Sequence, residues 1–359
     1  MPGPSRAEIE AALEKSGLLA NARIESADVE SGRVTVVLAI ERAFAAAAEK
    51  LRPSAEAALK SLPGAASASI VFTAHREPHT HAHEQPRPAA RELAIPGVKS
   101  LIAVASGKGG VGKSTVAVNL AVALSRQGKK IGLLDADIYG PSVPHLLGLA
   151  GRKPESDGKK LQPMLAHGLK AMSIGFLIDV DTPMIWRGPM VVSALSQLMT
   201  DVDWGELDVL VMDLPPGTGD AQLTIAQRVR LSGAVIVSTP QDIALIDARK
   251  ALAMFRKTQV PILGIVENMS TFICPHCGEA TPIFGHGGAR ETAQQLDAPF
   301  LGEIPLTLAL RETSDAGTPI AAAAPGGAEA KAFAALATQV WAALASGAHA
   351  KPAPKIVIQ

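Results

Sequence analysis

The chain has 359 residues, of which 47% are hydrophobic and 3% aromatic, with 34 Lys+Arg, 34 Asp+Glu and two cysteines. Two cysteines exclude a disulfide scaffold, and the balanced charge argues against a nucleic-acid or membrane-surface protein that binds through a basic face. No apolar run reaches the roughly 18 residues of a membrane helix and the N-terminal residues lack the apolar segment of a signal peptide, so a cytoplasmic α/β protein of two or three domains is expected.

Residues 1–75 have the pattern of a small α+β domain. Helical spacing at 6–15 is followed by two strand-like runs, which meet at Ser31-Gly32. A third strand closes the module after an Ala-rich helix whose Pro53 predicts a kink or a split. The expected strands are Ala22–Val29, Arg33–Ile40 and Ala65–Thr73, and the helix spans 42–61. No dense polar cluster suggests chemistry here.

Residues 76–97 are rich in proline and predict a linker. Four closely spaced histidines lie directly before it or in its first half, namely His75, His79, His81 and His83. They could form a metal site, but a solvated Pro-rich linker is favoured, because a metal site needs ligands in a fixed geometry with supporting contacts.

Residues 98–346 alternate strand-like and helical runs, and a short tail, 347–359, follows. Several strands are continuous apolar runs, as expected for strands buried on both faces of a parallel sheet. The pattern predicts a doubly wound, mostly parallel α/β sheet with its ligand at the carboxyl ends of the strands. The strands are expected at Leu101–Ala105, Lys130–Leu134, Leu169–Ser173, Leu207–Met212, Gly233–Val237, Ile262–Val266 and Phe300–Gly302, and the helices at 113–127, 188–200, 241–257, 288–296 and 328–345.

A phosphate-binding loop is the strongest signal in the sequence. The segment fits G-x-x-x-x-G-K-[ST] between an apolar strand and an amphipathic helix, which is the context that supports this motif. Its glycines allow backbone N–H groups to face phosphates, Lys113 is expected at the β- and γ-phosphates of ATP, and Ser114 at Mg²⁺. The segment consists of Gly107, Lys108, Gly109, Gly110, Val111, Gly112, Lys113, Ser114 and Thr115.

Lys108 occupies the second position of this loop, where most residues are tolerated. It cannot easily reach the phosphates of its own loop beside Lys113. It could instead stabilise charge on a nucleotide in a facing subunit, as an arginine finger does. A solvated loop lysine is the other interpretation.

Three aspartates follow predicted strands at the same edge of the sheet. Asp213 ends an apolar strand in the Walker B arrangement and is expected to hold Mg²⁺ through water. Asp137 is the candidate for orienting the attacking water, and Asp135 for supporting Mg²⁺. A helix cap or turn is the alternative, and it stays open for Asp135 and Asp220. The Pro/Gly-dense loop 214–220 has the composition of a nucleotide-dependent switch.

The two cysteines, Cys274 and Cys277, form a C-P-H-C sequence. A thiol–disulfide site is disfavoured, because no helix is expected to start there and stabilise a thiolate. As a metal site the pair supplies two thiolates, whereas zinc or a 4Fe–4S cluster takes four ligands, which a two-fold dimer could provide. His276 or His286 could complete a zinc site within one chain, and a pair of inert thiols is the third interpretation.

Together these motifs resemble the Mrp/ApbC family of iron–sulfur cluster carrier ATPases, within the MinD/ParA class whose deviant Walker A loop has the lysine of Lys108. The resemblance covers about residues 98–345 and rests on Gly107–Thr115, Asp135–Ser142, Ile185–Met190, Asp213–Asp220, Val266–Ser270 and the C-P-H-C sequence. Residues 1–75 resemble, less specifically, the small domain that bacterial members carry before the ATPase domain.

The resemblance implies a homodimer that holds a labile 4Fe–4S cluster on Cys274 and Cys277 of both chains. It further implies ATP binding, slow hydrolysis coupled to cluster loading or transfer, and exchange with scaffold proteins and apo-protein clients. By the same resemblance Asn268, and with it the Thr239–Gln241 loop, is expected at the adenine.

Two rival functions stay open. One is a zinc-stabilised dimeric ATPase that acts as a metal chaperone. The other is a MinD/ParA-like positioning ATPase at a membrane or on DNA, which would need a basic amphipathic helix. Residues 328–346 contain Lys331 as their single basic residue, so we expect neither a nucleic-acid nor a membrane partner.

Overall fold

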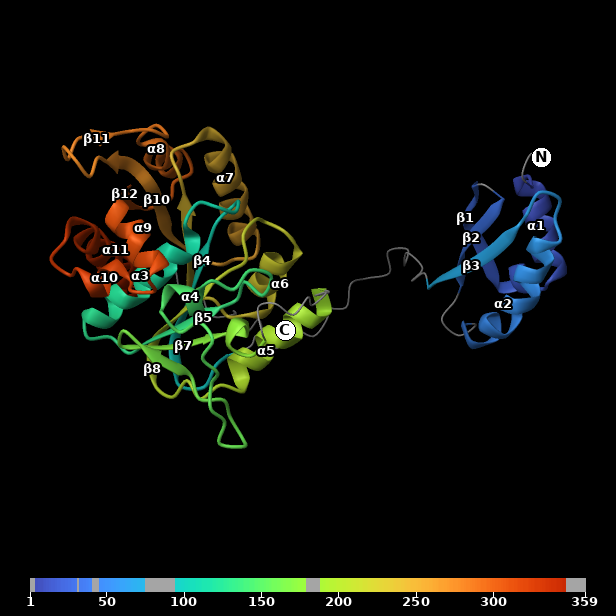
Figure 1. Cartoon of the computed structure of the whole chain (residues 1–359), viewed down its shortest axis with the longest axis horizontal. Coiled ribbons are helices and arrows are strands. Elements are labelled where there is room, and N and C mark those ends of the chain that lie inside the picture. The colour runs from blue at the N-terminus through green and yellow to red at the C-terminus, as the bar shows by residue number, and fades with distance from the viewer. Residues whose placement is uncertain (1–3, 31, 41–44, 75–93, 179–187, 347–359) are drawn as a thin grey trace, which may run out of the picture. The chain divides into compact units, whose positions relative to one another are not determined.

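The computed structural model describes residues 4–30, 32–40, 45–74, 94–178 and 188–346 (Figure 1). The chain forms two compact units, Met1–Arg87 and Pro88–Gln359. Each unit has its own hydrophobic core, and each is described by itself below.

The smaller unit is a three-stranded sheet with two helices. Strands β1 and β2 are an antiparallel hairpin, and β3 adds parallel to β2 in the order β1-β2-β3. Apolar side chains of β2 alternate between buried and half-buried, as expected for a sheet with one covered face. The elements are α1 (Arg6–Lys15), η1 (Leu18–Asn21), β1 (Ala22–Glu30), β2 (Arg33–Ile40), α2 (Ala45–Lys60) and β3 (Ser67–Ala74).

Pro53 does not split its helix. Helix α2 runs from Ala45 to Lys60 with the proline inside it, so of the two predicted outcomes the split is wrong, and the kink stays a prediction. A proline removes one backbone hydrogen bond of a helix, but the buried Ala48, Ala55 and Leu59 lie on both sides of it in the core. Packing therefore keeps the helix continuous across the lost bond.

The larger unit is built on a nine-stranded sheet in the order β11-β10-β9-β4-β8-β5-β7-β6, with β12 paired to β10. The pairs β7–β5, β5–β8, β8–β4, β4–β9, β9–β10 and β10–β12 are all parallel. The short strands β6 and β11 add antiparallel to β7 and β10. This confirms the predicted doubly wound, mostly parallel fold. The strands are β4 (Val98–Ala105), β5 (Ile131–Asp135), β6 (Met164–Ala166), β7 (Leu169–Ser173), β8 (Leu207–Asp213), β9 (Gly233–Ser238), β10 (Ile262–Ile273), β11 (Ala280–Thr281) and β12 (Phe300–Leu306).

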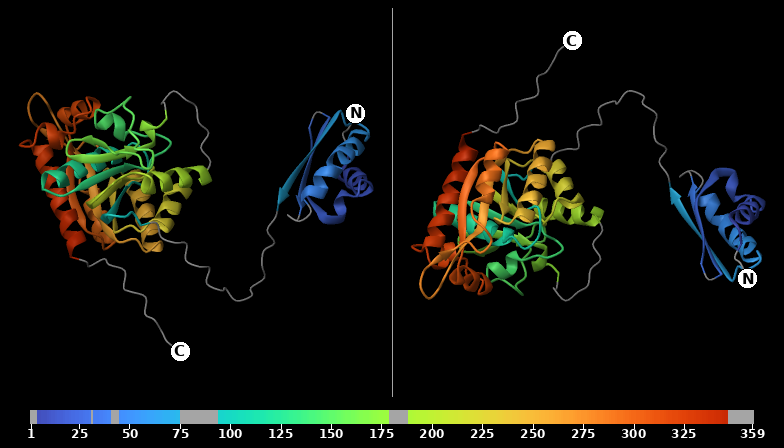
Figure 2. Two further views of the ribbon diagram at one scale, coloured as in Figure 1. Left: turned by 90° about the horizontal axis from the view of Figure 1, so that it is seen from below. Right: turned by 90° about the horizontal axis from the view of Figure 1, so that it is seen from above.

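Helices cover both faces of this sheet (Figure 2). Helices α3 and α11 lie together on one face, and α5, α6 and α7 lie over the other, because right-handed crossovers in opposite directions place them on opposite faces. The helical elements are α3 (Lys113–Arg126), α4 (Val143–Leu146), η3 (Ile174–Phe176), α5 (Gly188–Thr200), α6 (Asp220–Arg228), α7 (Asp242–Lys257), α8 (Gly288–Gln295), α9 (Leu308–Asp315), α10 (Ile320–Ala323) and α11 (Ala328–Ala345).

Two differences from the predicted elements affect the site. Strand β10 continues to Ile273 rather than ending at Val266, so it leads directly into Cys274. Helix α6 begins at Asp220, where the sequence pattern predicts a loop. Among the described residues, no helix is long and apolar enough to cross a membrane.

Candidate functional site

The predicted phosphate loop and aspartates meet at the carboxyl edge of the central strands. Asp135 and Asp213 are register partners on the neighbouring strands β5 and β8. Val104 of β4 is paired with the same Asp213, so the loop that follows β4 starts beside both carboxylates. Parallel pairing thus gathers groups that lie far apart in the sequence.

Two glycines of the loop adopt a left-handed backbone, with φ of 80° at Gly110 and 78° at Gly112. Only Gly112 is also crowded, because a Cβ there would collide with the amide nitrogen of Asn268. Gly107 lies directly against the backbone of Asp247 in α7. The loop therefore needs glycine for both conformation and close approach.

Lys113, the first residue of α3, forms a buried ion pair with Asp213. Its Nζ lies 2.5 Å from Asp213 Oδ1 and 3.2 Å from Ser114 Oγ. The Asp213 side chain is 0% exposed, and its Oδ2 has no hydrogen-bond partner in the described part of the chain. A buried carboxylate oxygen without a partner is a ready acceptor for a cation or its bound water, so Ser114 and Asp213 fit the predicted Mg²⁺ site.

Asp135 is buried and accepts three hydrogen bonds. The donors are the N–H groups of Asp137 and Val143 and the Ser173 hydroxyl, at 3.0 to 3.1 Å. Burial, together with the neighbouring Asp213 carboxylate, raises the pKa of Asp135 to about 7. Val143 is the first residue of α4, so Asp135 accepts a hydrogen bond from the start of this helix. This is the helix-cap or turn role that the sequence left open for Asp135.

Asp137 lies at the wall of a cavity of about 520 Å³. Burial raises the pKa of its carboxyl group, against the opposing effect of Lys113. The N–H of Gly140 donates to its Oδ1 at 3.3 Å. The other wall comes from the loop after β8 and the start of α6, and the lining is formed by Asp137, Tyr139, Gly140, Pro215, Pro216, Gly219, Ala221 and Gln222.

Lys108 belongs to the phosphate loop, whereas Asn268 contacts the loop from β10. Lys108 is half-buried, its carbonyl accepts from Ser106 Oγ at 2.9 Å, and it forms no ion pair with any residue that the structure describes. Asn268 is buried and its Nδ2 donates to the Val111 carbonyl at 2.8 Å. Asn268 thus supports the backbone of the loop, while its contact with adenine stays a prediction.

The Thr239–Gln241 loop is separate from that contact. Pro240 and Gln241 line a polar cavity of about 480 Å³ between α7 and α8, and Asn268 is not among the residues that line it.

The two cysteines lie on the turn that joins β10 to β11. Gly278 N–H donates to the Cys274 carbonyl at 2.9 Å, and Cys274 N–H donates to the Glu279 carbonyl at 3.0 Å. Backbone N–H groups of Cys277 and His276 donate to the Cys274 sulfur and lower the pKa of its thiol. No helix starts at this turn, as predicted. Cys277 is exposed and Cys274 is half-buried, so both thiols are accessible for ligation.

No third ligand joins the cysteines within the described part of one chain. The single described group of three possible ligands is Glu267, His286 and Glu303. His286 Nε2 lies 2.9 Å from Glu303 Oε2, and Glu303 is also bound by Arg290. His286 is thus engaged elsewhere, and neither it nor His276 completes a zinc site with the cysteines.

Some predicted features fall outside the described residues. They are the linker histidines His75, His79, His81 and His83, and Ile185, Trp186 and Arg187 of the motif before α5. Met190, the last residue of that motif, is described, lies on α5 and is exposed.

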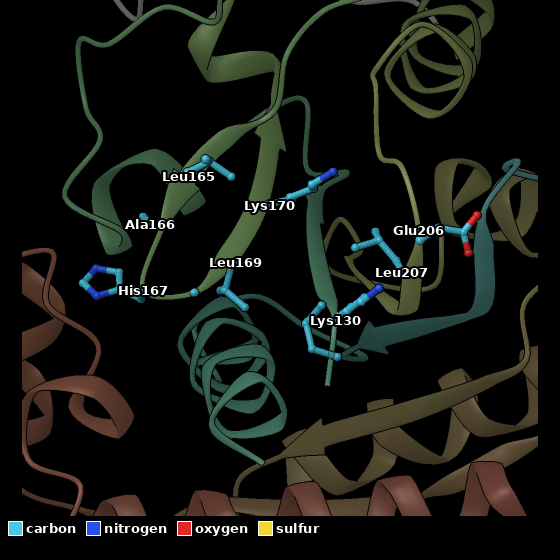
Figure 3. Close-up of a pocket in the computed structure, with 10 residues that line it drawn as sticks. Lys130, Leu165, Ala166, His167, Leu169, Lys170, Glu206 and Leu207 are labelled. Carbon is cyan, nitrogen blue, oxygen red and sulfur yellow. The ribbon is translucent and has the colours of Figure 1, made fainter. Parts of the chain in front are cut away.

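A separate hollow of about 700 Å³ lies at the opposite edge of the sheet (Figure 3). Lys130, Leu169 and Leu207 mark the amino ends of β5, β7 and β8, and Leu165 projects from β6 with 73% of its surface exposed. None of the predicted site residues lines this hollow.

Two buried polar residues near the site were not predicted. Glu267 accepts from the N–H groups of Gly287 and Ala289 and so holds the start of α8. Gln222 joins the phosphate loop to the loop after β8. Gln222 lies two residues beyond Asp220, in a helix that the sequence did not predict.

Both units of the chain match known protein families. A model of the family described as NUBPL iron-transfer P-loop NTPase matches residues 97–341, and a model described as iron-sulfur cluster assembly protein matches residues 6–71.

Two relatives and one solved structure illustrate the match. The chain is 56% identical over 250 residues to the "iron-sulfur protein required for NADH dehydrogenase, mitochondrial" of Arabidopsis thaliana, covering 69% of this chain and 80% of the relative. It is 56% identical over 232 residues to the iron-sulfur cluster carrier protein of Escherichia coli K12, covering 64% and 63%. The nucleotide-binding protein of Archaeoglobus fulgidus, solved with ADP, is 47% identical with a TM-score of 0.55, covering 62% of this chain and 87% of that chain. The chain therefore belongs to the NUBPL iron-transfer P-loop NTPase family, whose members include iron–sulfur cluster carrier proteins.

Proposed function

We propose that this protein is an ATP-dependent carrier that holds a labile 4Fe–4S cluster between two copies of the chain and transfers it to apo-proteins. The observation that carries the proposal is the Cys274–Cys277 turn. It presents two accessible thiols, with the Cys274 thiolate favoured by backbone N–H donors, and no third ligand of the described chain accompanies them. Two thiolates are half of a four-ligand site, and a two-fold axis supplies the other half.

The nucleotide site would bind ATP through the loop Gly107–Thr115. Lys113 would exchange its contact with Asp213 for the β- and γ-phosphates, and the helix end of α3 would add its positive dipole. Ser114 and Asp213 would hold Mg²⁺, which neutralises phosphate charge when bound. Asp137 would orient the attacking water from the wall of its cavity, and Asp135 would support the Mg²⁺ side of the site through the Asp137 backbone.

Lys108 would act on the nucleotide of the facing copy. It has no ion pair among the described residues, so its charge is available to a second chain. Binding of ATP would order the loops after Asp137 and Asp213, and the loops would change the contact between the two copies and hence the geometry of the shared cluster. Hydrolysis would be slow and coupled to cluster loading or release.

The proposal also includes the partners, the cellular location and the roles of the domains. Clients would be apo iron–sulfur proteins, with scaffold proteins as the source of the cluster, and the site of action would be the cytoplasm. Residues 1–75 would form a partner-binding domain tethered by the linker 76–97 to the ATPase domain 98–346, followed by the tail 347–359.

Anaerobic reconstitution tests the cluster site. The wild-type protein, reconstituted with iron and sulfide, is expected to gain visible absorption and about two iron atoms and two sulfides per chain, as one four-iron cluster per dimer requires. Cys274→Ala is expected to lose this iron and to bind ATP as the wild type does. Ser346→Ala, on the C-cap of α11, is the matched control.

The outcome also separates the zinc alternative. A protein that is purified with zinc and exchanges none of it for iron would be a zinc-stabilised ATPase. Full iron and sulfide content in Cys274→Ala would contradict the cysteine site itself.

A further inference from the structure

Gln222 is a buried side chain that faces two carbonyl groups. It lies on α6, is 1% exposed, and its Nε2 donates to the Pro215 carbonyl at 2.7 Å and to the Ser106 carbonyl at 3.4 Å. Ser106 immediately precedes the phosphate loop, and Pro215 lies two residues after Asp213. One amide group therefore bridges the two segments that flank the nucleotide site.

The two hydrogen bonds determine the orientation of the Gln222 side-chain amide. Carbonyl oxygens accept hydrogen bonds and cannot donate them, so the NH₂ end of Gln222 must face Ser106 and Pro215. The N–H of Gly217 donates to the same Ser106 carbonyl at 3.1 Å, which adds a backbone contact to the bridge. The Oε1 end of the Gln222 amide therefore does not face the Ser106 and Pro215 carbonyls.

Gln222 Oε1 is buried and has no hydrogen-bond partner in the described part of the chain. Buried acceptors are rarely left unpaired, and an ordered water commonly supplies the missing donor. Gln222 lines the cavity of about 520 Å³ whose other wall carries Asp137. Gln222, which carries the unpaired acceptor, and Asp137 therefore line the same cavity.

We propose that Gln222 is a positioning residue for ATP hydrolysis, which holds a water between its Oε1 and the Asp137 carboxylate while its Nε2 fixes the loop after Asp213 against the phosphate loop. The water would keep the Asp137 carboxylate in the orientation that the attacking water needs. The inference rests on the proposed ATPase function, because it concerns the same site.

The test compares Gln222→Met and Gln222→Glu with the same changes at Gln227, an exposed residue of the same helix. In Gln222→Met, kcat for ATP is expected to fall roughly tenfold or more, while KM and the affinity for a non-hydrolysable ATP analogue change by less than about threefold. Gln227→Met should match the wild type. A wild-type kcat in Gln222→Met, or a loss explained by weaker nucleotide binding, would overturn the proposal.

Gln222→Glu gives a second readout that does not depend on how well Gln222→Met folds. The new side chain cannot donate to either carbonyl when it is ionised, whereas in its protonated form it can donate to Pro215 and accept at its other oxygen. The ratio of kcat in this variant to that of the wild type should therefore rise as pH falls, and the ratio for Gln227→Glu should stay flat. The other titratable groups on the cavity wall, Asp137 and Tyr139, are common to both proteins and cancel in the ratio.

A flat ratio for Gln222→Glu would overturn the proposal. Cluster content is measured alongside and should equal that of the wild type in all four variants, since the cysteines lie on the β10–β11 turn. If the wild type hydrolyses ATP but holds no cluster, the carrier function fails while the role of Gln222 is still tested by kcat.

Discussion

The nucleotide edge of the sheet and the cysteine turn are built in opposite ways. At the nucleotide edge, Lys113, Asp135 and Asp213 are buried and already bound to one another or to the backbone. At the turn, Cys277 is exposed and the two thiols meet no third ligand in the described chain. One group of residues is assembled by the fold of a single chain, and under the proposed function the other is half of a site.

This difference indicates what each site requires. The buried charges cost desolvation energy, which their mutual contacts offset, so these side chains are held together without a ligand. The thiols belong to no such network of charged groups, although backbone N–H groups donate to the Cys274 sulfur. Under the proposed function, a nucleotide would thus bind to one chain, whereas a stable cluster would need two.

The largest effect is expected for Lys113→Ala, which should weaken ATP binding and leave cluster binding unchanged. The variant loses the charge that meets the phosphates, and we expect ATP affinity to fall at least roughly 100-fold. Reconstituted iron and sulfide should stay at the wild-type level, because Lys113 lies on α3 and the thiols lie on the β10–β11 turn. Calorimetric titration with ATP and iron analysis on one preparation measure both.

Lys99→Ala is the matched control for this variant. Lys99 is 70% exposed and pairs with Asp208 at the other end of the sheet. Wild-type ATP affinity is expected there. Loss of the cluster in correctly folded Lys113→Ala would show that the two sites are not separable.

A smaller effect is expected from mixing two inactive variants. If Lys108 acts on the facing nucleotide, Lys108→Ala and Asp137→Asn each lose hydrolysis, but a mixed dimer regains one complete site. Equal mixing gives half mixed dimers with one of two sites intact, so about a quarter of wild-type kcat per chain should return. Steady-state phosphate release from the mixture measures it. No recovery on mixing would place the action of Lys108 within its own chain.

The last prediction concerns the backbone of the phosphate loop. Gly112→Ala and Gly128→Ala both place alanine at a positive φ, 78° and 80°, which costs about 1–2 kcal/mol of stability. Only at Gly112 would the new Cβ also meet Asn268, so about 1–3 kcal/mol more is expected there. Urea denaturation measures both, and Asn268→Ala should recover the excess at Gly112. Equal losses at the two glycines would contradict the crowding.

The sequence predicts the nucleotide edge well because its residues follow strand ends at fixed spacing. The P-loop pattern places Lys113 at a helix start, and apolar runs that end in Asp135 and Asp213 place both carboxylates at one edge. Strand pairing is parallel in the centre of the sheet, so adjacency in space follows from the strand order. The ion pair between Lys113 and Asp213 follows from that adjacency.

The sequence does not reveal Gln222, Glu267 or the length of β10, for different reasons. Gln222 lies in α6, directly after a Pro/Gly-dense run that masks the helix start. Glu267 is a charged residue in a strand, and its role depends on α8, about 20 residues further on. The strand β10 continues through polar Asn268 and Ser270, where hydrophobic periodicity ends although pairing to β12 resumes at Phe272.

Strand β10 connects the phosphate loop to the cysteine turn without a break. Asn268, near its middle, binds the phosphate loop, and Ile273, its last residue, adjoins Cys274. Pairing to β9 ends at Glu267 and a left-handed Met269 follows, so the outer half of the strand is held only by β11 and β12 in the described sheet. One residue inserted between Asn268 and Cys274 would therefore shift the thiols relative to the phosphate loop. The length of β10 thus sets the separation between the phosphate loop and the cysteines.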